Sequence, residues 1–122
     1  MDNQIKSKSA TLLVMSCSGA SNTGAYTDMI ARQLDEQHDA DMVCLTKIAI
    51  GDPKLLYKVK NAHGKCIILD GCPIHCAKKI LNNAGISEFI HLTITDFGIK
   101  KGVDPIIRVN VDKIIMHIKS LN

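Results

Sequence analysis

Two continuous apolar segments, each followed by a helical pattern, constrain the fold of this 122-residue chain most strongly. They are TLLVMSC (residues 11–17) and CIILDG (residues 66–71). Strands that are apolar at successive positions are typical of parallel sheets, in which both faces are covered. Two further segments read as strands, DMVCLT (41–46) and EFIHLTITD (88–96).

Helical patterns separate and follow these strands. The first predicted helix ends near residue 37, and the second begins at Asp52-Pro53. The third covers CPIHCAKKILNNAG (72–85), and the fourth, which is amphipathic, covers residues 107–121. The alternation predicts an α/β fold: a three-layer α/β/α domain with a mostly parallel four-stranded sheet and helices on both faces, Rossmann-like or flavodoxin-like. We expect residues 1–10 to form a flexible N-terminal segment and residues 11–122 a single domain.

Composition limits the classes of function. With 46% hydrophobic and 22% charged residues the chain is an ordinary globular protein. A net charge of +3 and 3% aromatic residues argue against a nucleic-acid partner. The polar start MDNQIKSKSA is no signal peptide, and no apolar run reaches membrane-spanning length. We therefore expect a cytoplasmic protein without membrane contact, whose five cysteines stay reduced and favour metal binding or thiol chemistry.

Several cysteines fall where parallel strands end. Cys17 ends the first predicted strand, Cys72 follows the third, and Asp96 follows the fourth. Because the carboxyl ends of parallel strands share one edge of the sheet, we expect these three side chains to meet there. Cys44 joins them if its strand ends at the same edge, whereas Cys66 lies inside a strand and reads as a buried core residue.

Cys72 and Cys76 stand four residues apart. With Pro73 in the first helical turn, both sulfurs would share one helix face near the positive end of its dipole, which favours the thiolate that binds zinc. His75, one residue from Cys76, is expected to point away from that face and to be exposed. His91 is expected to be structural.

The loop CSGASNTG (17–24) supports an alternative. Its backbone amides, near Gly19 and Ser21, could cradle an anion. It lacks a Walker lysine, but it resembles the cysteine loop of the IIB proteins of the phosphotransferase system. On this reading the protein is a thiol enzyme, with Cys17 as nucleophile or phosphocysteine and Asp96 or His75 as proton partner.

The segment DGCPIHCAKKIL (70–81) resembles the Asp-Gly-Cys motif of the DGC domain family, whose members are proposed to bind zinc. The likeness extends in order through CSGAS with Gly24, MVCL around Cys44, and TDFGIKK from Thr95, so that it spans about residues 13–101.

The resemblance implies a zinc site of four cysteines: Cys17, Cys44, Cys72 and Cys76. Four thiolates also suit an iron–sulfur cluster. We expect a metal ion, and in addition a small-molecule or anionic ligand, as partners, with Asp70, Asp96 and Lys100 near the metal. A redox or persulfide-carrying role of Cys72 and Cys76 is a third reading. Neither catalytic residues nor an oligomeric state follow from the sequence.

Overall fold

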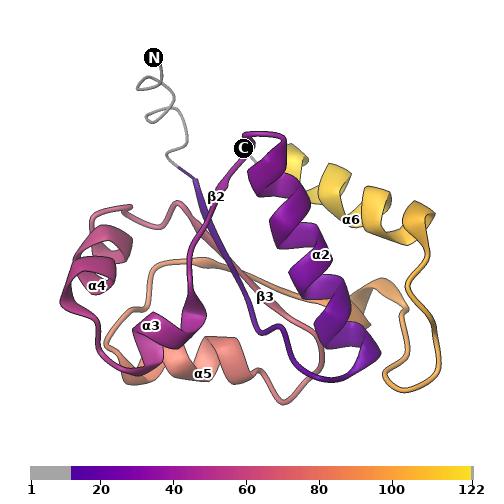
Figure 1. Ribbon diagram of the computed structural model, residues 1–122, viewed down its shortest axis with the longest axis horizontal. Helices are drawn as coiled ribbons and strands as arrows, with labels where there is room; N and C mark the ends of the chain where they lie inside the picture. The colour runs from indigo at the N-terminus through magenta and orange to yellow at the C-terminus, as the bar shows by residue number, and fades with distance from the viewer. Residues whose placement is uncertain (1–11, 122) are drawn as a thin grey trace.

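Four parallel strands form one sheet in the computed structural model, which describes residues 12–121 (Figure 1). The strands are β1 (Leu13–Ser16), β2 (Asp41–Met42), β3 (Cys66–Asp70) and β4 (Ile90–Thr93), in the spatial order β2-β1-β3-β4. This parallel sheet confirms the predicted α/β fold, and its order is that of the first four strands of flavodoxin-like proteins. The flexible segment expected at residues 1–10 lies outside the described residues.

The two central strands are buried at every position, as the continuous apolar segments predicted. β1 and β3 pair along their length, with Leu13 opposite Cys66 and Ser16 opposite Leu69. β4 is mostly half-buried, and β2 has only two residues. Because all four strands run the same way, the loops that follow them meet at one edge of the sheet.

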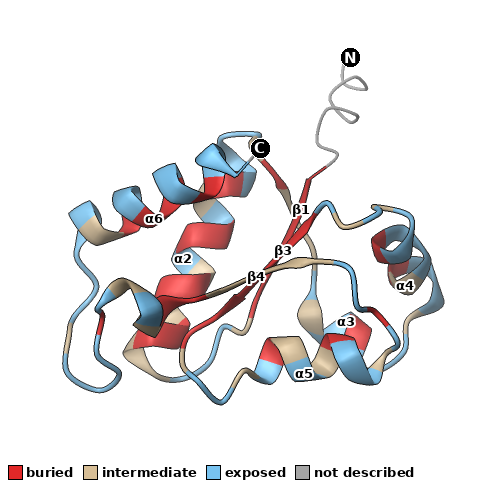
Figure 2. Cartoon of the chain, turned by 180° about the vertical axis from the view of Figure 1, so that it is seen from behind, coloured by how far each residue is buried: buried red, intermediate tan, exposed pale blue. Residues whose placement is uncertain are grey.

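Helices cover both faces of the sheet and make three layers. The helices are α2 (Asn22–Glu36), α3 (Leu45–Ala49), α4 (Pro53–Lys60), α5 (Cys76–Asn83) and α6 (Arg108–Ser120), with the short 3₁₀ helix η1 (Ile94–Phe97) after β4. On one face, α2 and α6 pack over one apolar cluster that includes Tyr26, Ile30 and Ile114. On the other, α3, α4 and α5 pack over a second cluster that includes Met15, Ile68 and Leu81. Figure 2 shows the buried strands between the two helical layers.

Two segments differ from their predicted secondary structure. The predicted strand 41–46 ends at Met42 and turns into α3. Ile48, only 2% exposed, packs into the second apolar cluster, and a helical turn places Leu45 beside it. The predicted strand 88–96 ends at Thr93, after which Gly98, with φ of 84°, terminates η1.

The helix α5 begins later than predicted, and this changes how Cys72 and Cys76 are arranged. The helix was expected from Cys72 and Pro73, but it begins at Cys76, and residues 71–75 form a turn. His75 precedes the helix with φ 57° and ψ 48°, the left-handed conformation, which cannot continue a right-handed helix. Cys72 and Cys76 are therefore not on one helix face.

Candidate functional site

A hollow of about 400 Å³ lies at the carboxyl edge of the sheet, where β1 and β3 end. In a sheet of this order, the chain leaves β1 and β3 toward opposite faces, and ligands bind in the crevice between such strands. The residues lining the hollow come from the two loops and from a third segment: Cys17, Gly19, Ala20, Ser21, Asp70, Gly71, Cys72, Ile74, His75, Cys76 and Lys101. Three of the four predicted thiol ligands, and the predicted Gly19, Ser21 and Asp70, thus border one hollow.

The loop after β1 holds Cys17 at the rim of this hollow. The Cys17 amide donates to the carbonyl of Leu69 at 2.9 Å, which ties the end of β1 to β3. Its Sγ lies 3.6 Å from Oγ1 of Thr27, and the same oxygen accepts the amide of Ser18 at 3.1 Å. Ser21 then caps α2 by accepting the amide of Gly24. The Cys17 side chain is therefore held by the first two turns of α2.

Two glycines allow the loops to approach each other closely. A Cβ on Gly71 would lie 2.7 Å from the backbone nitrogen of Gly24 and 2.7 Å from the carbonyl carbon of Thr23. A Cβ on Gly24 would in turn lie 2.6 Å from the carbonyl oxygen of Gly19. Both contacts are to backbone, which cannot rotate away. The glycine of the Asp-Gly-Cys motif is thus required by packing between the β3 loop and the start of α2.

Asp70 fixes the turn that carries Cys72 and Cys76. Its side chain is only 1% exposed. One carboxylate oxygen accepts the amide of Ala77 at 2.8 Å, and the other accepts the amide of Lys78 at 3.1 Å and lies 2.8 Å from Nε2 of His91. The carboxylate therefore satisfies free amides of the first turn of α5 and compensates its dipole from the end of β3.

His75 and His91 form a polar cluster under the start of α5. The two rings pack edge to face with centroids 4.8 Å apart. Nε2 of His75 lies 3.2 Å from Oγ1 of Thr93, while His91 contacts Asp70. His75 is half-buried and borders the hollow, so the expectation that it is exposed was wrong. His75 has a positive φ of 57°, and its ring contacts Thr93 and His91.

A lysine that the sequence did not single out approaches the thiols. Nζ of Lys101 lies 3.5 Å from Sγ of Cys72, whereas the predicted Lys100 is exposed and does not line the hollow. Asn22 anchors this loop to the start of α2, because its side chain bonds the backbone of Lys100, Gly102 and Asp104. Asp96 is exposed in η1 and is not among the residues that line the hollow.

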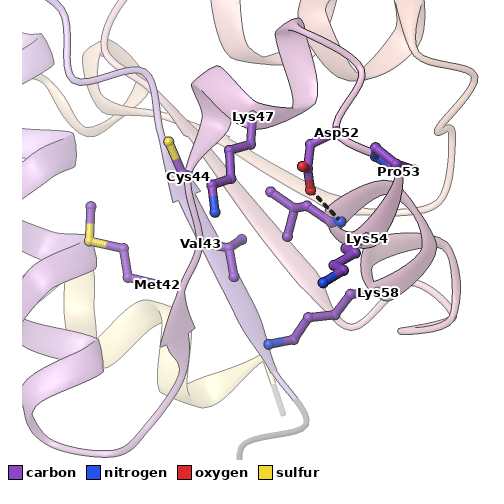
Figure 3. A pocket seen from close by; sticks show the side chains of 9 residues that line it. Met42, Val43, Cys44, Lys47, Asp52, Pro53, Lys54 and Lys58 are labelled. Carbon is purple, nitrogen blue, oxygen red and sulfur yellow. Dashed lines mark hydrogen bonds between the residues drawn. The ribbon is translucent and has the colours of Figure 1, made fainter.

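Cys44 is not among the residues that line this hollow. It precedes α3, is exposed, and borders a second hollow of about 410 Å³ that also includes Cys17. The backbone amide of Lys47, chiefly, lowers the pKa of the Cys44 thiol, against the opposing effect of desolvation. Cys44 also borders a larger hollow of about 730 Å³ between β2 and α4, into which Lys47, Lys54 and Lys58 extend (Figure 3).

The described side chains do not form a finished metal centre. All five cysteines are free thiols. Between Leu12 and Leu121, no three His, Cys, Asp or Glu side chains lie close enough together to hold one ion as they stand. Cys66 is buried within β3, as predicted, and burial raises the pKa of its thiol to about 12. None of the helices in this part of the chain has the length and apolarity needed to cross a membrane.

Comparison with known proteins identifies relatives of this chain. The sequence profile of the DGC domain matches residues 13–118, nearly the whole described chain. A curated relative, the "Anaerobic and virulence modulator AnvM" of Pseudomonas aeruginosa, is 36% identical over 89 residues, which cover 73% of this chain and 67% of AnvM. No solved structure matches significantly. The profile match over residues 13–118 and the similarity to AnvM show that this chain belongs to the DGC domain family.

Proposed function

We propose that this protein binds a zinc ion through cysteine thiolates at the carboxyl edge of the sheet. The supporting observation is that Cys17, Cys72 and Cys76, which lie up to 59 positions apart in the sequence, border one hollow between the two central strands. Thiolates are soft ligands that select zinc or an iron–sulfur cluster over magnesium or calcium. Cys44 is the fourth ligand that the family resemblance implies, and it borders a neighbouring hollow that also includes Cys17.

The donor set fits zinc in its chemistry, and the surroundings fit a thiolate centre. Lys101 brings one positive charge to Cys72, and the buried Asp70 holds the loop without presenting a free carboxylate. Cys76 is exposed and Cys72 is partly exposed, so both side chains have room to turn toward Cys17. Binding an ion would require that turn, because the thiols do not converge as they stand. The bound ion would join the loops after β1 and β3.

The part that the ion plays in the cell is also a proposal. AnvM is named as a modulator. By analogy, we propose that this chain regulates a partner in the cytoplasm, where thiols remain reduced, and that its metal state changes the exposed loops around the hollow.

Metal analysis of reduced protein, purified without chelator, tests the proposal. We expect about one zinc per chain, released when thiols are alkylated. Serine variants of Cys17, Cys72 and Cys76 should each lose the metal, while Cys66→Ser, which changes a buried thiol outside the hollow, should keep it. A visible charge-transfer spectrum with bound iron would indicate the cluster instead. Wild-type protein that binds neither metal would refute the proposal.

The alternative of a thiol enzyme rests on the position of Cys17. Its thiol borders both smaller hollows, at the entrance to α2, but the contacting side chain is the hydroxyl of Thr27 rather than a base. If Cys17 is a nucleophile, it should be the fastest thiol to react with iodoacetamide at neutral pH. Cys17→Ser should then abolish that reaction and Cys44→Ser should leave it unchanged.

The expected anionic ligand finds its best support in the lysine-lined hollow between β2 and α4 (Figure 3). Asp52 is the acidic residue among its lining, and its carboxylate caps α4 by accepting the amide of Leu55 at 2.9 Å. Three lysines therefore line this hollow with a single carboxylate, which already accepts the amide of Leu55. We propose that this hollow binds a small molecule with two or more phosphate or carboxylate groups. Pyrophosphate should bind, and Lys54→Glu with Lys58→Glu should abolish the binding, whereas Lys113→Glu on α6 should not.

A further inference from the structure

We propose that His75, rather than Cys44, supplies the fourth ligand of the metal centre, so that the site is Cys17, Cys72, Cys76 and His75. This inference rests on the proposed metal binding and specifies its ligand set. It departs from the four-cysteine site that the family resemblance implies.

The first observation is the distribution of the donors between hollows. His75 borders the same hollow as Cys17, Cys72 and Cys76. Cys44 borders two others, and only Cys17 joins it to the first. In addition, Cys44 is exposed, whereas His75 is half-buried. An ion held in the hollow between the β1 and β3 loops would therefore have His75 among the residues that line its site, whereas Cys44 is not among them.

The second observation is the anchoring of the His75 ring. Nε2 lies 3.2 Å from the hydroxyl of Thr93, and the ring packs at 4.8 Å, edge to face, with His91. A metal-binding histidine characteristically donates its other ring N–H to an oxygen, which fixes both tautomer and orientation. In the tautomer that carries its proton on Nε2 and donates it to Thr93, Nδ1 is unprotonated and can act as a ligand. His91, held in turn by the buried Asp70, keeps the ring from rotating away.

The third observation is the backbone of His75. A φ of 57° is unfavourable for a residue with a side chain, and such conformations persist where the surroundings enforce them, often at functional sites. The turn places His75 immediately before Cys76 and three residues after Cys72. The amide of His75 also donates to the carbonyl of Cys72 at 3.1 Å, so the ring and both thiols belong to one closed turn.

Charge favours the same ligand set. Zinc with three thiolates and a neutral imidazole carries one net negative charge, and zinc with four thiolates carries two. In the hollow, Lys101 is the cation that lies beside a thiol, at 3.5 Å from Cys72. One lysine neutralises the three-thiolate site completely and leaves the four-thiolate site charged, which is costly at a partly buried position.

Cobalt substitution of the full reduced chain tests the ligand set. Tetrahedral Co²⁺ gives thiolate charge-transfer bands whose intensity grows with the number of thiolates, and its ligand-field bands move to shorter wavelength when nitrogen replaces sulfur. We expect the wild type to show a three-thiolate, one-nitrogen spectrum. Cys44→Ser should keep that spectrum and bind zinc within about threefold of the wild type. His75→Asn should change the spectrum and weaken zinc binding by at least ~10–100-fold, the loss seen when groups that support a metal site are removed.

The variants are chosen to separate ligation from folding. Asparagine tolerates the left-handed conformation, so His75→Asn keeps the turn while removing the imidazole. His63→Asn is the matched control, because His63 is exposed and has a φ of 50°, and it should behave as wild type. Circular dichroism of each variant checks the fold.

Two results would overturn the inference. A four-thiolate cobalt spectrum that Cys44→Ser abolishes and His75→Asn preserves would establish Cys44 as the ligand, with metal binding itself upheld. Loss of metal in both variants would also overturn it, because Cys44 would then be needed. A wild-type chain that takes up neither cobalt nor zinc would instead end the proposed function on which the inference rests.

Discussion

Asp70→Asn should destabilise the protein strongly, although it replaces one oxygen by a nitrogen of similar size. The Asp70 carboxylate is buried and accepts from three donors: the amides of Ala77 and Lys78, and Nε2 of His91. Asparagine has one acceptor oxygen. If that oxygen keeps Lys78 and His91, the side-chain amide faces the Ala77 N–H, donor against donor, at a residue with no exposed surface.

The cost follows from these contacts. A hydrogen bond to a charged group contributes about 1.5–3 kcal/mol, and leaving a buried donor unpaired costs about 1–3 kcal/mol. These effects overlap, so we expect a loss of about 3 kcal/mol in the free energy of unfolding. For a domain of this size the loss corresponds to a Tm lower by roughly 10 °C.

Urea denaturation followed by circular dichroism measures the loss, and the chain offers a matched control. Asp52 also accepts a helix-start amide, that of Leu55 at 2.9 Å, but it has that single backbone contact and is half-buried. Because asparagine caps helices as well as aspartate does, Asp52→Asn should cost less than about 0.5 kcal/mol. If the two variants lose equal stability, or if Asp70→Asn loses less than its control, the role given to Asp70 is wrong.

Three further predictions concern the loops and the core. Gly71→Ala should lower the free energy of unfolding by about 1–3 kcal/mol, because its Cβ would lie 2.7 Å from the backbone of Thr23 and Gly24. Gly19→Ala is the control and should cost little, because a Cβ on Gly19 has open space around it. Equal denaturation midpoints of the two variants would contradict this prediction. Tyr26→Phe should lower the free energy of unfolding by about 1–3 kcal/mol, because the hydroxyl of the buried Tyr26 donates to the carbonyl of Pro105 at 3.0 Å and accepts from Ile107 and Asn110. Tyr57 is exposed, so Tyr57→Phe should leave stability unchanged. Thermal melts of the two variants test this difference. Burial raises the pKa of Cys66 from its ordinary 9.0 to about 12. The unfolded chain therefore releases a proton that the folded chain keeps, and the free energy of unfolding should fall as pH rises from about 9 toward 12, by up to ~1.4 kcal/mol per pH unit. Cys66→Ala should flatten that slope in denaturation series, and identical slopes would count against a buried, neutral thiol.

Much of the fold was predictable because the information is local. The segments 11–17 and 66–71 are apolar at successive positions, and a strand of that kind has to be covered on both sides. The helix opened by Asp52 and Pro53 was predicted from its cap, and α4 begins at Pro53 as expected. The boundaries that failed are those where tertiary contacts compete with local preference. Ile48 of α3 packs into the second apolar cluster. Asp70, six positions before Cys76, accepts the amides of Ala77 and Lys78 in the first turn of α5.

The same division holds for the site. The expectation that Cys17 and Cys72 lie at one edge followed from the parallel sheet, and both border the hollow, whereas Asp96, expected with them, does not. The positions of Lys101 and His75 beside these thiols did not follow from the sequence. Lys101 rather than Lys100 faces Cys72, because Asn22 fixes the backbone of that loop across 78 positions of sequence. His75 borders the hollow and has a positive φ, which no helical projection of the segment 72–85 would predict.

By itself, the sequence determined the order of strands and helices, the burial of the central strands and the presence of thiols at strand ends, since each depends on residues near one another in the chain. The tertiary structure alone decided which of those thiols share a hollow, which histidine borders it and which lysine approaches it. These positions depend on backbone torsions in turns and on hydrogen bonds between distant loops. Small shifts of a side chain there decide whether it can bind an ion or only lies near one.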